Sequence, residues 1–281
     1  MSVEIDTTLF KITEDDVRRY ETDGAICLRG IFSETWRKQI ADGIEQGLAK
    51  PGPYGRVQSD PGDPGFFFTD YYVWRHIPVL KRFAEESPGA AVAARLTRSK
   101  QINYFFDGIF VKKPGTVKAT TWHQDQVYYN VDGQKIIVLW IPIDPVTKAT
   151  CLSFVRGSHR WGKNYVPVLI KGNRVPEGLG PEFEPAPDVE ANRAQYDILS
   201  WDMEPGDCIA FQPMMLHGAA GNTLPIQRRA LQTTWLGDDC VYAARKVEVE
   251  PRIEGRAFKN GERLVDEAIF PKVWPRAHAA A

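Results

Sequence analysis

The segment TTWHQDQVYY, residues 120–129, places a histidine two residues before an aspartate. In a β-strand, residues i and i+2 point to the same face, so His123 and Asp125 would project together while Gln124 points the other way. An imidazole beside a carboxylate supplies two parts of a metal site. The same two side chains could form a hydrogen-bonded pair at a sheet edge, and an isolated H-x-D motif favours that interpretation.

A further histidine, His217, follows the predicted strand DCIAF, residues 207–211. Two imidazoles and one carboxylate on a rigid sheet form the facial triad of non-haem Fe(II) oxygenases, whose open positions take a co-substrate and dioxygen. A catalytic zinc site accepts the same ligands, so ligand type alone does not identify the metal. Of the remaining histidines, His76 and His278 are predicted to be structural or solvated, and His159 lies in a turn after a predicted strand.

Two adjacent arginines, Arg228 and Arg229, open the predicted strand RRALQTTWL. Only one of two neighbouring strand residues can face inward. A buried guanidinium is a preferred partner for a carboxylate, because its planar fork donates two parallel hydrogen bonds. An inward arginine would therefore anchor an anionic co-substrate, and a solvated strand edge is the alternative.

The elements that must position these side chains are short strands in the second half of the chain. From about Gln101, β-branched and aromatic runs alternate with turn signals, a spacing that predicts a β-sandwich or barrel. The polar, proline-rich residues 171–195 predict a long loop or insertion. The predicted strands are INYFF, GIFVKK, KIIVLWIPI, CLSFV, DCIAF and RALQTTWL.

The first third of the chain predicts mostly helices, apart from a short strand at residues 24–30. Thr13, followed by acidic residues, and Ser33 are typical helix N-caps. Residues 77–97 predict a helix interrupted near Pro88. We expect one domain over residues 1–281, with a helical part to about 98, a β core to about 240 and a C-terminal extension over 241–281.

Composition excludes several classes of protein. The 281 residues are 43% hydrophobic and carry a formal net charge of −1, which suits a large core and not a basic nucleic-acid-binding face. No apolar stretch approaches the roughly 20 residues that span a bilayer, and the first ten residues lack a signal-peptide layout. Four dispersed cysteines predict buried free thiols. We therefore expect a soluble cytoplasmic protein.

An ordered series of motifs resembles a known family. The motifs WHQDQVYY, VLWIPID, FVRGSHRWG, EPGDCIAFQPMMLHGAAGN and RRAL resemble the phytanoyl-CoA dioxygenase family of Fe(II)/2-oxoglutarate-dependent oxygenases. The resemblance covers most of the chain, up to about residue 240. It implies a mainly β fold with flanking α-helices and a double-stranded β-helix core, also called jelly-roll or cupin-like.

The resemblance also implies the metal and the reaction. His123, Asp125 and His217 would bind Fe(II) and form the catalytic centre. With 2-oxoglutarate and O2, the enzyme would hydroxylate an unactivated C–H bond and release succinate and CO2. Halogenases of the superfamily carry a small residue at the carboxylate position, so Asp125 favours hydroxylation.

Further residues follow from the resemblance. Arg228 would anchor 2-oxoglutarate, with Arg229 as the alternative if the register differs by one. Gln124 and Trp140 would line the co-substrate pocket. A polar residue that some members carry two residues after the second histidine is here Ala219, so one co-substrate hydrogen bond would be missing or supplied elsewhere.

The substrate is not identified beyond a small organic or natural-product-like molecule. The aromatic residues 65–75 could line a pocket mouth or pack in the core. An acyl-CoA would need basic residues for its phosphates. Five candidates exist, although scattered surface charge is their usual explanation: Lys81, Arg82, Arg95, Arg98 and Lys100. Two alternative functions are a cupin-like metalloenzyme that does not use 2-oxoglutarate, and so has no need of Arg228, and a non-catalytic binding protein. The sequence does not predict an oligomeric state.

Overall fold

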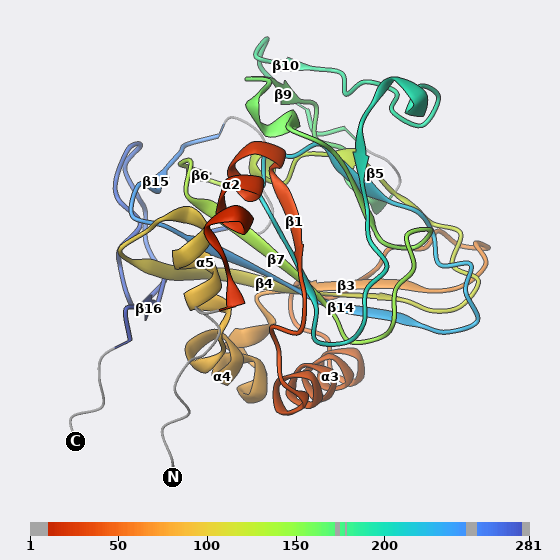
Figure 1. The fold of residues 1–281 in the computed structure, drawn as a ribbon, viewed down its shortest axis with the longest axis horizontal. Helices are drawn as coiled ribbons and strands as arrows, with labels where there is room; N and C mark the ends of the chain where they lie inside the picture. Colours follow the sequence, from red (N-terminus) through yellow and green to blue (C-terminus); the bar gives the residue numbers. More distant parts are fainter. Residues whose placement is uncertain (1–10, 172–174, 178, 246–251, 277–281) are drawn as a thin grey trace.

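Two β-sheets packed face to face form the centre of the protein in this computed structural model, which describes residues 11–171, 175–177, 179–245 and 252–276. The larger sheet has eight strands and the smaller has four. Helices α3 and α4 lie on one side of the larger sheet, and the strands of the smaller sheet lie on the other (Figure 1). The mainly β architecture with flanking helices is the one that the sequence predicts.

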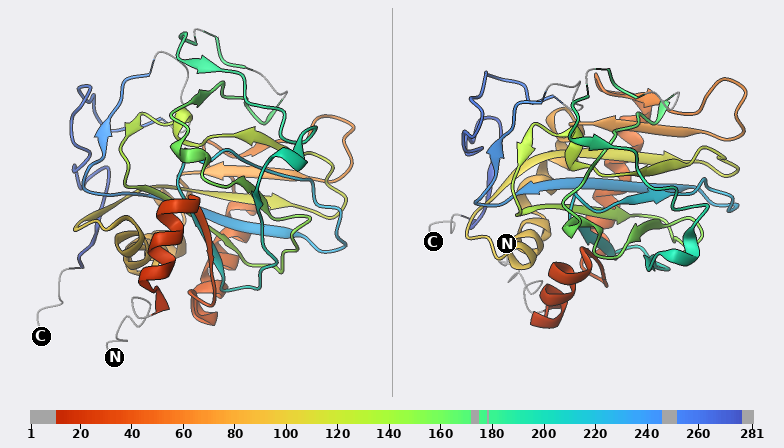
Figure 2. Two further views of the ribbon diagram at one scale, coloured as in Figure 1. Left: turned by 45° about the horizontal axis from the view of Figure 1, so that its top comes forward. Right: turned by 90° about the horizontal axis from the view of Figure 1, so that it is seen from above.

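The larger sheet joins strands from distant parts of the chain in the order β1-β12-β7-β14-β4-β3-β2, with β16 also pairing with β4. All these pairs are antiparallel. Figure 2 shows strands of very different sequence colour lying side by side. The strands are β1 (Ala25–Leu28), β2 (Arg56–Val57), β3 (Phe67–Tyr71), β4 (Ile102–Lys112), β7 (Ile136–Pro142), β12 (Cys208–Phe211), β14 (Arg228–Leu236) and β16 (Lys272–Trp274).

The smaller sheet has the order β11-β8-β13-β5. In this sheet, β5 and β13 form an antiparallel pair in which His217 lies opposite His123. Its strands are β5 (Thr120–His123), β8 (Leu152–Val155), β11 (Ile198–Leu199) and β13 (His217–Ala219). Two small pairs lie outside both sheets: β9 (Asn164–Tyr165) with β10 (Phe183–Glu184), and β6 (Val131–Asp132) with β15 (Val241–Tyr242).

The central strands of the larger sheet are buried on both faces. On β7, Ile137 and Leu139 join the core beneath the helices, whereas Val138 and Trp140 join the core between the two sheets. This double burial explains why KIIVLWIPI is apolar almost throughout instead of alternating.

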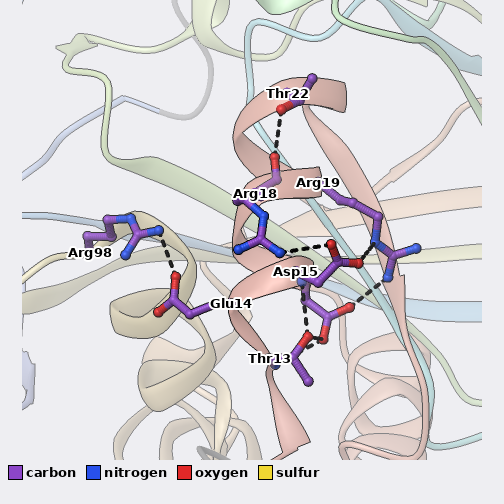
Figure 3. Close-up of polar contacts among 8 residues, drawn as sticks. Thr13, Glu14, Asp15, Arg18, Arg19, Thr22 and Arg98 are labelled. Atoms are coloured by element: carbon purple, nitrogen blue, oxygen red, sulfur yellow. Dashed lines mark hydrogen bonds and ion pairs between the residues drawn. The ribbon is translucent and has the colours of Figure 1, made fainter.

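The helices begin and end close to the predicted residues. Thr13 caps its helix through a capping box, in which its side chain and that of Asp16 each accept a hydrogen bond from the other residue's backbone N–H (Figure 3). Ser33 caps the second helix, and the predicted break near Pro88 separates the last two. The helices are α2 (Glu14–Asp23), α3 (Glu34–Ala49), α4 (Pro78–Glu86) and α5 (Gly89–Thr97).

The N-terminal part of the chain contributes strands to the β core as well as the predicted helices. Strands β1, β2 and β3 all precede residue 98, yet each belongs to the larger sheet. The runs INYFF and GIFVKK form one continuous strand, β4, of 11 residues. These strands are stabilised by pairing with distant segments, such as β1 with β12, and local sequence patterns do not report that pairing.

The cysteines, the helices and the basic residues can each be compared with what the sequence predicts. All four cysteines are free thiols, and three of them are buried. In the part of the chain that the structure describes, no helix is long and apolar enough to cross a membrane. Four of the five basic residues considered for phosphate binding form ion pairs on the helical surface, as Figure 3 shows for Arg98: Lys81 with Glu85, Arg82 with Glu86, Arg95 with Glu14, and Arg98 with Glu14 and Glu21.

A buried carboxyl group on β4 gives the stability of the fold a pH dependence. Asp107 is fully buried, and its side chain accepts a hydrogen bond from the backbone N–H of Trp74 at 3.1 Å. Burial is the main cause that raises the pKa of Asp107 to about 8. Because the value in an unfolded chain is about 3.9, the folded protein holds this proton more tightly. The stability that depends on this proton is complete below about pH 4 and is lost as the pH rises toward about 8.

We expect Asp107→Asn to stabilise the protein at pH 8 by about 2 kcal/mol, because asparagine keeps a hydrogen-bonding side chain without a charge to bury. Near pH 4 the two proteins should differ little. Urea unfolding at both pH values measures this, with Asp42→Asn on the exposed surface of α3 as the control. Equal effects of Asp107→Asn at the two pH values would contradict the assignment.

Candidate metal centre

Three side chains from two neighbouring strands converge between the sheets. His123 is the last residue of β5, His217 is the first residue of β13, and the two lie opposite each other in the strand register. Asp125 follows β5 after one residue. The candidate ligand atoms of these three residues all lie within 4.8 Å of one another.

The way in which Asp125 reaches His123 differs from the prediction. The strand ends at His123, and Asp125 has φ −69° and ψ −40°, in the right-handed helical region, where it begins the 3₁₀ turn Gln126–Tyr128. The turn, rather than strand alternation, brings the carboxylate to 3.1 Å from His123 Nε2. The same carboxylate oxygen lies 3.6 Å from His217 Nε2.

Backbone carbonyl groups orient both imidazole rings. His123 Nδ1 lies 2.8 Å from the carbonyl oxygen of Thr121, and His217 Nδ1 lies 2.9 Å from that of Met215. Because a carbonyl oxygen can only accept, each Nδ1 must carry the donated hydrogen. In the neutral ring, Nε2 then keeps its lone pair and points toward Asp125. This is the orientation that a metal ligand requires.

The environment favours a neutral His217 beside an ionised Asp125. Burial, followed by the charge of His123, lowers the pKa of His217 to about 4. Burial opposes ionisation of Asp125, but its interactions with the His217 and His123 side chains outweigh burial, so the pKa of this carboxyl is lowered. Burial also opposes the charged form of His123, yet Asp125 raises the pKa of that ring. A cation bound here would replace the proton that His123 and Asp125 share.

Two neighbours of Asp125 were missed by sequence reasoning. Gln232, on β14, donates from Nε2 to Asp125 Oδ2 at 3.2 Å. Tyr129 is buried beside the site, and its hydroxyl group helps to lower the pKa of Asp125. Gln232 stands four residues after Arg228, so the period of two in a strand places both on one face. That spacing was the available signal.

A cavity of about 500 Å³ opens from the three converging residues. Trp140 and Ala219 line it, as does Arg228. Gln124 does not line it. Its amide donates to the carbonyl groups of residues 163 and 214 and accepts from the backbone N–H of residue 165. The expected place of Gln124 in a co-substrate pocket is therefore corrected: its side chain supports the backbone behind the site.

The two neighbouring arginines point to opposite faces of the larger sheet: Arg228 toward the cavity and Arg229 toward helix α3. Arg228 is 6% exposed, and its guanidinium donates to the carbonyl oxygen of Thr150. Within the described residues it has no carboxylate partner. Burial lowers its pKa to about 10, so the side chain stays charged at neutral pH. Arg229 instead donates two hydrogen bonds to Asp144, at 2.7 and 3.0 Å, and one to Glu45 at 2.7 Å.

The aromatic residues around β3 point alternately to the cavity and to the core, which are the two places that the sequence allowed for them. Phe67 and Tyr71 line the cavity, whereas Phe68 packs in the helical core. The ring of Tyr71 lies between those of Phe106 and Phe110, with centroids 6.2 and 6.0 Å away. Gly108 makes room for it, because a Cβ at that position would come within 2.8 Å of the Tyr71 ring.

His76 and His159 do not line the cavity. His159 Nε2 lies 3.2 Å from the carbonyl oxygen of Glu21, which agrees with a structural role. His76 ends the 3₁₀ turn Val73–Arg75, and its ring lies beside Gly52. His278 falls outside the described residues.

Comparison with known proteins identifies close likenesses in sequence and fold. The family model for phytanoyl-CoA dioxygenase (PhyH) matches residues 20–230. Human peroxisomal phytanoyl-CoA dioxygenase is 26% identical over 176 residues, which cover 57% of this chain and 49% of the human protein. A probable phytanoyl-CoA dioxygenase of Caenorhabditis elegans is 29% identical over 146 residues, 47% of this chain and 42% of that protein. The matched part thus spans about half the length of these relatives.

Two solved structures share the fold over almost the whole chain. The non-haem, α-ketoglutarate-dependent carbocyclase SnoK of nogalamycin biosynthesis superposes with a TM-score of 0.73 at 21% identity, covering 95% of this chain and 98% of its own. EctD from S. alaskensis, solved with 2-oxoglutarate and 5-hydroxyectoine, gives 0.63 at 17% identity and covers 85% and 88%. At this identity the likeness establishes the fold, and it confirms the predicted double-stranded β-helix.

Proposed function

Because the chain belongs to the phytanoyl-CoA dioxygenase (PhyH) family, we propose that it is a non-haem Fe(II)/2-oxoglutarate-dependent dioxygenase that hydroxylates an unactivated C–H bond of a small molecule. The products from the co-substrate are succinate and CO2. The observation that carries the proposal is a cavity lined by two complementary groups. One is the cluster of His123, Asp125 and His217, and the other is the buried Arg228, which has no carboxylate partner among the described residues. The first fits a cation and the second fits an anion.

The donor set fits ferrous iron. Two imidazole nitrogens and one carboxylate oxygen form a facial triad that leaves coordination positions open. When bound, iron and 2-oxoglutarate supply the activation of dioxygen. The protein's part is to hold His123 and His217 by their Nδ1 atoms and to fix Asp125 through Gln232. Arg228 holds the distal carboxylate of the co-substrate, and Trp140 covers the inner wall of the cavity.

The cavity walls indicate the character of the substrate. Tyr71, Phe106 and Phe110 form an aromatic wall on the larger sheet, and Leu169 and Ile170 contribute aliphatic surface from the loop after β9. Such walls accept an apolar portion of a small molecule and exclude water from the reacting atoms. Halogenases of the superfamily carry a small residue where this chain has Asp125, so the carboxylate favours hydroxylation over halogenation.

We also propose a cytoplasmic location and no nucleic-acid partner. The four free thiols support a reducing compartment. The formal net charge of −1 gives no excess of basic residues for binding a phosphate backbone.

The test is an anaerobic titration of the purified apoprotein with Fe(II) and then 2-oxoglutarate. We expect a weak metal-to-ligand charge-transfer band in the visible range, and we expect His217→Ala to remove it because one ligand is lost. Iron binding without a band would favour a cupin-like metalloenzyme that does not use 2-oxoglutarate. Absence of iron binding would favour a non-catalytic binding protein.

A further inference from the structure

A second buried basic side chain lies beside Arg228. Lys112, at the end of β4, pairs in register with Arg228 on β14, so the two side chains leave the sheet on the same face. Lys112 is fully buried. Its Nζ donates to the carbonyl oxygen of Ala220 at 3.0 Å and lies 4.5 Å from the ring centroid of Phe67, which lines the cavity.

Neither basic side chain has an acidic partner in the portion of the chain that the structure describes. Among the described residues, Asp125 is the only acidic side chain that lines the cavity, and it belongs to the metal centre. A buried charge is costly unless it is paired. Burial, and then the charge of Arg228, lower the pKa of Lys112 well below its usual range. An anion beside Arg228 would offset this repulsion and favour the charged form of Lys112.

We infer that Lys112 is a positioning residue for the anionic co-substrate, adding a second positive charge behind the Arg228 end of the cavity. The inference rests on the proposed function and extends it, because it makes the anion site depend on two strands, β4 and β14. Lys112 is not among the residues that line the cavity and would act on the anion through space, while the face of the Phe67 ring, which lines the cavity, attracts its ammonium group. It is therefore expected to select co-substrates that carry a distal carboxylate.

The neighbouring Lys113 offers a matched control. Its Nζ also lies over a phenylalanine ring, at 4.8 Å from the centroid of Phe66, but the residue is exposed. Lys113 has the same side chain as Lys112 but lies on the exposed surface and not beside Arg228. Replacing either lysine with methionine keeps an unbranched, apolar side chain of similar length and removes the ammonium group.

The experiment measures dissociation constants by the charge-transfer band in anaerobic Fe(II) protein. We expect Lys112→Met to weaken 2-oxoglutarate binding on the order of tenfold, because a charge in a poorly screened site is lost. Lys113→Met should change it less than about twofold, as is usual for exposed charges. 2-Oxobutyrate, which keeps the chelating end but has no distal carboxylate, should bind wild type and Lys112→Met alike. Lys112→Gln gives a second replacement, and thermal unfolding checks that both variants fold.

The outcomes separate this inference from the proposed function. Unchanged 2-oxoglutarate affinity in both folded Lys112 variants would overturn the inference alone. An equal loss for 2-oxoglutarate and 2-oxobutyrate would also overturn it, since Lys112 would then act on the fold or the chelating end. If wild type binds Fe(II) but no 2-oxoglutarate, the proposed function fails, and the inference fails with it.

Discussion

Replacing Asp125 with alanine should abolish turnover, with a loss of at least about 1,000-fold, and should weaken iron binding. The change removes a ligand and the negative charge that offsets a divalent cation. The two histidines keep their backbone hydrogen bonds, so the apoprotein should still fold. Succinate release and iron content after dialysis measure the two effects.

A control for this change is available nearby. Asp132, on β6, is exposed and pairs with Arg245, so Asp132→Ala removes a carboxylate of the same type outside the cavity. It should leave iron content and turnover near those of wild type. Full turnover by Asp125→Ala would refute the assignment of the metal ligands.

The second large effect concerns the arginine pair. Arg228→Met should weaken 2-oxoglutarate binding about 100-fold, or by about 2.7 kcal/mol, because a buried carboxylate would lose its charged partner. Iron binding should remain, since Arg228 is not a ligand. The measurement is the dissociation constant of 2-oxoglutarate in the anaerobic Fe(II) protein.

Arg229→Met is the matched change one residue along β14. Arg229 pairs with Asp144 and Glu45 on the face of the sheet away from the cavity, so its loss should lower stability by about 1.5–3 kcal/mol and leave co-substrate binding unchanged. If Arg229→Met weakens 2-oxoglutarate binding and Arg228→Met does not, the inward face of β14 has been assigned to the wrong residue.

Sequence reasoning predicted the features whose signals are local. The helix caps at Thr13 and Ser33 depend on residues within one turn, and both are present in the structure. The β-rich texture after Gln101 likewise follows from residue type. The convergence of His123 with His217 needed a longer argument, because 93 intervening residues must return the chain to the neighbouring strand; there the ordered motifs of a known family supplied what periodicity could not.

The missed features depend on contacts that no local pattern encodes. Strand β3 was not predicted because both of its faces carry aromatic residues, one facing the cavity and the other the core, so the sequence shows no alternation of polar and apolar residues. Gln124 was assigned to the co-substrate pocket by resemblance, although strand geometry already turned it away from His123. The turn that carries Asp125 could not be foreseen, since neighbouring residues on both sides favour extended structure.

The hydrogen bonds that orient the two imidazoles have a consequence for how this protein can evolve. The acceptors are main-chain oxygens of Thr121 and Met215, so they persist whatever side chains those positions carry. The orientation of the two imidazoles is thereby independent of the side chains at those two positions, whereas Asp125 depends on the side chain of Gln232. Changes in the aromatic wall around Tyr71 leave the main-chain acceptors in place, so the same pair of imidazoles can serve beside differently shaped cavity walls.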